Sequence, residues 1–271
     1  SFNIRNVCED AHGIKWISTQ GGMNLFDGLK FNNIPLSTIG LNGADFSNMF
    51  YDNSNQTLYV SSTYQGIYGI RTQTGDLSFS FLLTESIFKQ LHDPWIRSIS
   101  KTEKYIWIGT QNGLNILDIN TRLLKKIKTP FQLSLDKKNP VRFITQIGKK
   151  NILAMFDGLG AVILDASNGQ IVSKINAQII NANEIFQGSF EISPNRHFIV
   201  TNEKISLLNL SNPSSPIFIS KLPISLNSFD ERITTASFDQ KKSQIWIATN
   251  KRVLIWDLTT STQIEVFELK L

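Results

Sequence analysis

The chain has 271 residues, of which 41% are hydrophobic and 18% charged, and this balance supplies a folded core and excludes a disordered chain. The formal net charge is +5, but Lys and Arg form no dense stripe interleaved with aromatic residues, so we expect no nucleic-acid partner. No apolar run reaches the roughly 20 residues that cross a bilayer, and the single cysteine, Cys8, excludes an internal disulfide.

The first part of the chain contains a pattern of short strands around a tryptophan. Trp16 stands in an alternating run, Thr19 follows it three residues later and Asp27 eleven residues later. Two-residue alternation of β-branched and aromatic residues, broken by Gly and Asp turns, predicts short strands. The predicted strands of this unit are Phe2–Glu9, Ile14–Ser18, Met23–Phe26 and Lys30–Ile34.

The same pattern recurs along the chain at a nearly fixed distance. Two further units keep the tryptophan, at Trp107 and Trp246, and three weaker units place Tyr59, Leu153 or Phe198 at that position. The separations between successive anchors, from position 16 to position 246, are 43, 48, 46, 45 and 48 residues. The clearest later strands are predicted over 95–100, 105–110, 114–119 and 123–127, and over 233–238, 244–249, 253–258 and 263–269.

Four-stranded units repeated every 40 to 50 residues are typical of a β-propeller. The sequence therefore predicts an all-β chain that forms one β-propeller domain over residues 1–271, six-bladed or seven-bladed with one blade missing. A short helical turn is expected only between Leu83 and Leu91. The predicted units cover about residues 1–43, 44–91, 92–138, 139–183, 184–228 and 229–271.

Two sets of recurring side chains have a structural interpretation. The tryptophans at 16, 107 and 246 are suited to fill the wedge between adjacent sheets. Aspartates recur at two turns of the unit, where a short acceptor side chain caps the backbone N–H groups. These aspartates are Asp10, Asp52 and Asp239 at the first turn, and Asp27, Asp118, Asp165 and Asp257 after the third strand.

The first and third units resemble the two-component regulator propeller repeat. The matching residues are Ile4–Val7, Glu9-Asp10, Gly13, Trp16-Ile17, Thr19 and Gly21-Gly22 in the first unit, and Ile96–Ile99, Ile106–Thr110 and Gly113-Leu114 in the third. This resemblance implies a periplasmic sensor region of a bacterial hybrid histidine kinase, in which the propeller binds or transmits a carbohydrate signal. It also implies that the membrane helix and the kinase belong to segments absent from these 271 residues.

No catalytic or metal site is predicted. The three histidines, His12, His92 and His197, fall in different units without a recurring partner, so neither a nucleophilic triad nor a metal cluster is expected. No cofactor is predicted either. Propeller lyases also resemble this repeat, but the sequence offers no convergent acid–base pair for such a reaction.

Arginines recur in the predicted first strands. Alignment on the anchors places Arg5, Arg97 and Arg142 at one position, and Arg232 two residues before it in the last unit. First strands line the channel of a propeller, so these guanidinium groups are predicted to converge on an anionic or polyhydroxylated ligand. The alternative is that they close strand ends against carbonyl or carboxylate groups.

The loops on one predicted face carry amides and aromatic rings, which suit sugars because amides match hydroxyl groups and aromatic rings stack on pyranose faces. Turn propensity alone would also place Gln and Asn there. The ligand-binding residues predicted in addition to the arginines are Trp95, Gln20, Tyr64, Gln111, Asn112, Asp157, Asn202 and Asn250.

The sequence therefore predicts a non-enzymatic, periplasmic sensor module of an inner-membrane receptor. Its expected partner is an oligosaccharide or another small polar or anionic ligand, with a homodimer formed through the full-length receptor. The alternative is a protein-interaction scaffold, because Phe190–Asn195 and Ile205–Leu210 resemble a WD-repeat blade.

Overall fold

The computed structural model describes residues 4–19, 22–34, 46–72, 78–128, 131, 138–175, 184–226 and 228–268, without the side chains of 78–79 and 264–268. The chain divides into two compact units, Ser1–Ile144 and Thr145–Leu271. The expected single domain stays a prediction. Within the described residues, no helix is long and apolar enough to cross a membrane.

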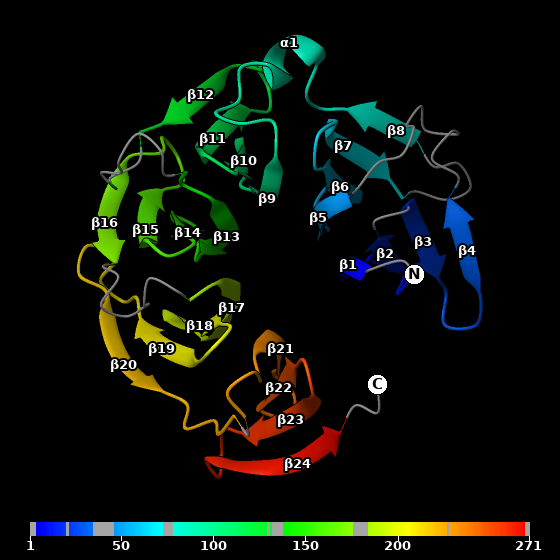
Figure 1. Cartoon of the computed structure of the whole chain (residues 1–271). Helices are drawn as coiled ribbons and strands as arrows, with labels where there is room; N and C mark the ends of the chain where they lie inside the picture. The colour runs from blue at the N-terminus through cyan, green and yellow to red at the C-terminus, as the bar shows by residue number, and fades with distance from the viewer. Residues whose placement is uncertain are drawn as a thin grey trace. The chain divides into compact units, whose positions relative to one another are not determined.

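The predicted fold, a β-propeller of six four-stranded units, is confirmed by six antiparallel sheets whose strands follow one another in chain order (Figure 1). The first three sheets have four strands each. Their strands are β1 (Ile4–Glu9), β2 (Lys15–Thr19), β3 (Gly22–Phe26) and β4 (Phe31–Ile34); β5 (Phe46–Asp52), β6 (Thr57–Ser62), β7 (Gly66–Arg71) and β8 (Ser78–Phe81); and β9 (Ile96–Lys101), β10 (Tyr105–Thr110), β11 (Gly113–Asp118) and β12 (Leu124–Ile127).

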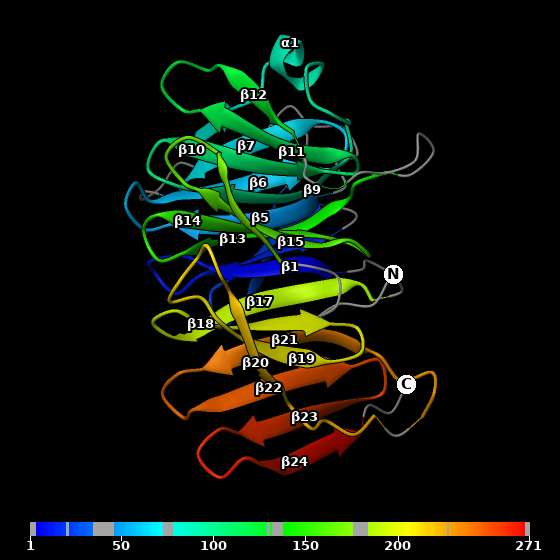
Figure 2. The same ribbon diagram turned by 90° about the vertical axis from the view of Figure 1, so that its left-hand side faces the viewer.

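The remaining sheets repeat this order, and Figure 2 shows the four strands of the last sheet, β21 to β24, in sequence from one edge to the other. The helical turn expected between 83 and 91 is α1 (Glu85–Phe88). The strands of the fourth, fifth and sixth sheets are β13 (Val141–Ile147), β14 (Asn151–Phe156), β15 (Gly160–Asp165) and β16 (Ile171–Ile175); β17 (Phe186–Ser193), β18 (Arg196–Thr201), β19 (Ile205–Asn209) and β20 (Ile217–Lys221); and β21 (Ile233–Asp239), β22 (Gln244–Thr249), β23 (Arg252–Asp257) and β24 (Thr262–Glu268).

Neighbouring sheets in each unit bury apolar side chains against one another. One cluster of the first unit joins Trp16 of β2 to Met49 of β5 and Leu58 of β6, and another joins Tyr59 to the third sheet. In the second unit, Phe198 of β18 packs with residues of the last sheet. Because burial of apolar surface is the dominant favourable term in folding, this face-to-face burial is the main stabilising contact between these sheets.

Two of the three tryptophans are buried as predicted, and the anchors Tyr59, Leu153 and Phe198 of the other sheets are buried as well. Trp16 is 1% exposed and Trp107 is fully buried, and the indole N–H of Trp16 donates to Oδ2 of Asp10 at 2.9 Å. The prediction is wrong for Trp246, whose exposed fraction is 36%. Among the described residues, β21–β24 is the last sheet of the second unit, and no described sheet of that unit follows it.

The recurring aspartates cap their turns as predicted. Oδ1 of Asp10 accepts the N–H groups of His12 at 2.8 Å and Ile14 at 3.1 Å. Oδ1 of Asp118 accepts two further backbone N–H groups, which hold the pKa of this carboxyl below its usual range. The same contacts are made by Asp27, Asp52, Asp165, Asp239 and Asp257.

Gly109 marks a close approach in the first unit. A Cβ atom at this position would lie 2.7 Å from the backbone oxygen of Val141 and would clash with Oγ of Ser98. That serine donates to the same Val141 oxygen at 2.9 Å. A side chain here would separate β10 from the start of β13, so the approach requires glycine.

Candidate functional site

Four of the predicted ligand-binding residues gather in the first unit, and we call Tyr64, Trp95, Arg97 and Gln111 the aromatic patch. The ring centroids of Tyr64 and Trp95 lie 6.0 Å apart, and the Arg97 guanidinium lies 4.6 Å from the Trp95 ring centroid. Nε of Arg97 donates to the side-chain oxygen of Gln111. The exposed fractions are 59% for Tyr64 and 37% for Trp95, so both rings reach solvent.

The backbone around Trp95 is fixed on both sides. Its N–H donates to Oδ1 of Asp93 at 2.9 Å, and its carbonyl accepts the N–H of Gln111 at 2.9 Å. The next residue, Ile96, is fully buried and donates its N–H to the carbonyl of Thr63 at 3.1 Å. A large ring on a backbone held in this way is preorganised, which lowers the entropy lost when a ligand binds.

The patch differs from the equivalent positions of the second unit. There, Asn202 and Asn250 stand at the position of Gln111 and use their side-chain oxygens to accept the N–H groups of Ile185 at 2.7 Å and Arg232 at 2.8 Å. In the patch, Asp93 accepts the corresponding N–H. The side-chain oxygen of Gln111 therefore does not cap the Trp95 N–H and accepts from Nε of Arg97 instead.

The other predicted site residues do not all join the patch. Arg5 is exposed on β1 and Arg142 is half-buried on β13, whereas the guanidinium of Arg232 donates to the carbonyls of Phe229 and Glu231. Convergence of the arginines therefore stays a prediction. Asn112 accepts the N–H of Asn139 at 3.2 Å, Asp157 accepts that of Phe186 at 3.2 Å, and Gln20 lies outside the described residues.

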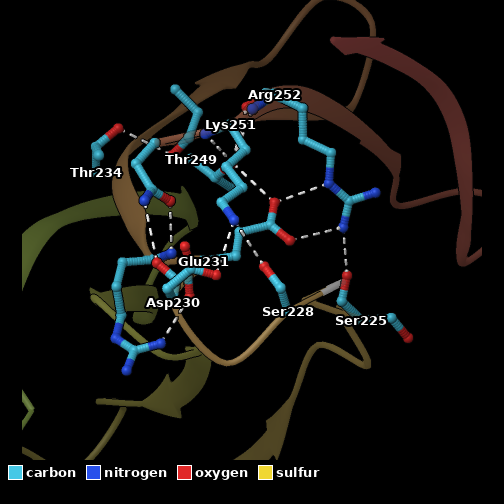
Figure 3. A network of polar contacts seen from close by, with 11 residues as sticks. Ser225, Ser228, Asp230, Glu231, Thr234, Thr249, Lys251 and Arg252 are labelled. Carbon is cyan, nitrogen blue, oxygen red and sulfur yellow. Dashed lines mark hydrogen bonds and ion pairs between the residues drawn. The ribbon is translucent and has the colours of Figure 1, made fainter. Parts of the chain in front are cut away.

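The structure also contains a buried ionic network that the sequence analysis missed, shown in Figure 3. Glu231 is fully buried and accepts from Nε of Arg252 at 2.8 Å, from Nη2 of Arg252 at 3.3 Å and from the hydroxyl of Thr249 at 2.9 Å. Nη2 of Arg252 also donates to the carbonyl of Ser225 at 2.7 Å. The network therefore fastens the segment before β21 to the turn between β22 and β23.

A sequence signal for this network exists in hindsight. The fifth sheet pairs Glu184, which is 1% exposed, with Lys204 at 2.7 Å, and the sixth pairs Glu231 with Arg252. In both sheets the cation follows the threonine of a Thr-Asn pair by three residues, as Lys204 follows Thr201 and Arg252 follows Thr249. In both sheets the glutamate also stands two residues before the first strand of the sheet. The corresponding turns of the other four sheets end in glycine, at Gly22, Gly66, Gly113 and Gly160, so these ion pairs are a feature of the fifth and sixth sheets.

The surface of this region carries a second ion pair. Hydrogen bonds from Lys251 and Ser228 lower the pKa of Asp230 to about 2. Nζ of Lys251 lies 2.7 Å from Oδ1 of Asp230, and both side chains reach solvent. Because solvent screens this pair, it contributes far less to stability than the buried pair beneath it.

The histidines occupy separate environments. His197 is 1% exposed, and burial lowers the pKa of its imidazole, although Glu191 opposes the shift from 3.8 Å. Burial also lowers the pKa of His92, whose ring contacts Oδ1 of Asn115 at 3.0 Å. Among the described residues, no group of three or more His, Cys, Asp or Glu side chains is placed to hold a metal ion.

Comparison with solved structures identifies related folds. The chain is similar to the extracellular domain of the "putative hybrid two component system BT3049" from B. thetaiotaomicron, with a TM-score of 0.72 and 17% identity over 99% of this chain and 35% of that one. For the extracellular domain of BT4673 from the same organism, the TM-score is 0.70 at 15% identity, over 98% of this chain and 33% of that one. The chain thus spans about a third of the length of these two domains.

A third similar structure is the β-propeller domain of Cps50 (Swd1) from Myceliophteria thermophila, with a TM-score of 0.70 and 12% identity over 99% of this chain and 90% of that one. No family model and no curated protein matches the sequence. At such low identities the similarity concerns the fold alone, and the chain shares its β-propeller fold with these domains.

Proposed function

We propose that this chain is the ligand-binding module of an extracytoplasmic two-component sensor and that it binds an oligosaccharide at the aromatic patch without catalysing a reaction. The observation that carries the proposal is the exposed Trp95 ring, held on a fixed backbone beside Tyr64 and Arg97. Aromatic rings bind sugars through the apolar faces of pyranose units, while a guanidinium and an amide donate to hydroxyl or acidic groups.

The fold similarity supports the sensor class because two of the similar structures are extracellular domains of proteins described as two-component systems. It does not distinguish a sensor from a scaffold, since the Cps50 propeller is equally similar. The choice therefore rests on the chemistry of the patch. The patch combines two exposed rings with a cation and an amide, and these groups can stack on a pyranose face and donate to its hydroxyl or acidic groups.

Calorimetric titration against a panel of neutral and acidic oligosaccharides tests the proposal. We expect Trp95→Ala and Arg97→Ala each to weaken binding by about 1 to 3 kcal/mol, because truncating a central aromatic or arginine side chain costs roughly this much. The melting temperature should change little, since both side chains reach solvent.

Phe229 provides a matched control in the second unit. Its ring is 94% exposed and lies 5.6 Å from the guanidinium of Arg232, so it reproduces the pairing of an aromatic ring with arginine. Phe229→Ala should leave binding unchanged. Absence of binding across the panel, or equal losses in the Phe229 and Trp95 variants, would contradict the proposed site.

A further inference from the structure

The outer strand of the fifth sheet, β20, exposes an unusual run of apolar side chains. All five of its residues are exposed, and Ile217, Phe218 and Ile219 have exposed fractions of 58%, 43% and 42%. The register against β19 shifts between Phe218 and Ser220, and this bulge interrupts the alternation of faces. Three successive apolar side chains therefore reach solvent along one sheet edge.

β20 is an open edge within the described part of the second unit. It pairs with β19 on one side, and no described strand pairs with it on the other (Figure 1, Figure 2). An edge strand presents unpaired N–H and C=O groups, and proteins usually protect such edges with charges or prolines. The centre of β20 carries neither, because its one charged residue, Lys221, is at the end.

Three other outer strands with described side chains are protected differently. β12 exposes Lys125 and Lys126 at its centre, so pairing with a second copy about that centre would place lysines opposite one another. β4 exposes two asparagines at its centre, and β16 carries Ser173 and Lys174. Like charges oppose self-pairing of β12, and β16 carries a lysine near its end, whereas the exposed run of β20 has no charge and no proline and its edge is interrupted only by the bulge after Phe218.

The approach to β20 is held in place. Oγ of Ser173 on β16 donates to the carbonyl of Pro213 at 2.6 Å, and Oδ1 of Asn212 accepts the N–H of Ser214 at 3.1 Å. The strand is therefore presented on an ordered segment, which reduces the entropy cost of docking another strand against it.

We propose that β20 is a self-association edge, at which a second copy of this chain pairs antiparallel about Phe218. The run Ile217-Phe218-Ile219 is symmetric about its centre, so this pairing places Phe218 opposite itself and Ile217 opposite Ile219 of the other copy. Such a two-fold contact is self-complementary and closed. It separates the two Lys221 side chains along the strand, so no like charges oppose the pairing.

The dimer formed in this way is weak. Three partly exposed side chains per copy bury less than the about 800 Å² per partner of a standard stable interface. We therefore expect monomer and dimer to exchange over the micromolar range or above, and to be stabilised when another part of a receptor brings two copies together.

Sedimentation velocity over a concentration series tests this proposal on the whole chain. We expect the unaltered chain to dimerise with increasing concentration and Phe218→Lys to remain monomeric. Phe31→Lys is the matched control, because Phe31 is also an exposed ring on an outer strand, 69% exposed on β4. A chain that stays monomeric throughout, or a dimer that Phe218→Lys does not dissociate, would overturn the proposal.

Mixing variants tests the register. Phe218→Lys and Phe218→Glu should each be monomeric, and an equimolar mixture should dimerise because opposite charges then face one another. A mixture that stays monomeric would exclude pairing about Phe218.

A cysteine variant keeps the test decisive if the charged variants fail to fold. Opposed residues of an antiparallel pair have Cα atoms about 4.5–5.5 Å apart, within the range of a disulfide. In a Cys8→Ser background, Phe218→Cys should form a disulfide-linked dimer on mild oxidation, and Phe31→Cys should form far less. Equal cross-linking of both variants would contradict the proposed pairing.

Discussion

Replacement of Arg252 by methionine should destabilise the second unit strongly, because it leaves the Glu231 carboxylate buried. Arg252→Met keeps most of the apolar stem but removes the donors that reach Glu231 at 2.8 and 3.3 Å and the Ser225 carbonyl at 2.7 Å. The hydroxyl of Thr249 remains as a donor at 2.9 Å. Removing one partner of a buried ion pair costs about 3–5 kcal/mol, and we expect a loss of this size in the free energy of unfolding.

Urea denaturation followed by circular dichroism measures this loss. The melting temperature should fall by on the order of 5–10 °C, since a 271-residue chain shifts by roughly 2 °C per kcal/mol. The double variant Glu231→Leu/Arg252→Met should recover much of the stability, because a buried pair can be replaced by apolar side chains.

Lys251→Met is the matched control for this prediction. It removes a cation from the adjacent position, where the ion pair with Asp230 reaches solvent. Its melting temperature should stay close to that of the unaltered chain. If Arg252→Met lowered the free energy of unfolding no more than Lys251→Met does, the argument that Glu231 needs Arg252 in its buried position would be refuted.

Three further predictions concern packing and pH. Gly109→Ala should lower the unfolding free energy by about 1–3 kcal/mol, measured in urea, because the added methyl meets the Val141 oxygen; an unchanged value would exclude the close approach. Burial raises the pKa of Asp52, but hydrogen bonds from Lys101 and Ser54 outweigh it and lower the pKa. The stability that Asp52 contributes should therefore be present above about pH 4 and be lost as pH falls through the pKa of Asp52 in the folded chain. The free energies of unfolding of Asp52→Asn and of the unaltered chain, measured in urea, should therefore differ at neutral pH and become equal in acid. Burial lowers the pKa of His197, so the chain should lose stability as pH falls below about 6.5 and its buried imidazole must be protonated. The melting temperature of His197→Leu should depend less on pH in this range. If the melting temperatures of the variant and the unaltered chain changed with pH in parallel, the buried neutral imidazole would be contradicted.

Features that depend on short sequence distances could be predicted well. The anchor spacing predicted six four-stranded units, and the recurring aspartates were correctly interpreted as turn caps because an Asx side chain reaches N–H groups two or three residues away. Trp246 was predicted wrongly for a different reason. Its burial depends on a sheet that follows it in the same unit, which the local pattern cannot report.

The site shows the same division between local and long-range information. The sequence selected Tyr64, Trp95 and Gln111 from one predicted loop face and Arg97 from the recurring first-strand arginines, but it could not tell which amides would be used for capping. Whether an amide at this turn position caps the backbone depends on a competing acceptor, as Asp93 provides for Trp95. The Glu231 network escaped prediction because Glu231 lies in the segment before β21 and Arg252 begins β23, so the two partners meet only in three dimensions.

The five tryptophans of the chain provide the most direct test of oligosaccharide binding at the aromatic patch. Two-dimensional NMR of the indole N–H groups, recorded while an oligosaccharide is added, can follow each ring separately. Trp95 and Trp246 are almost equally exposed, at 37% and 36%, so Trp246 is an internal control for non-specific stacking. We expect the Trp95 resonance to shift and saturate with the calorimetric dissociation constant while that of Trp246 stays in place. A ligand that binds with the Trp95 resonance unmoved, or that shifts Trp246 instead, would contradict the assignment of the aromatic patch as the sensing site.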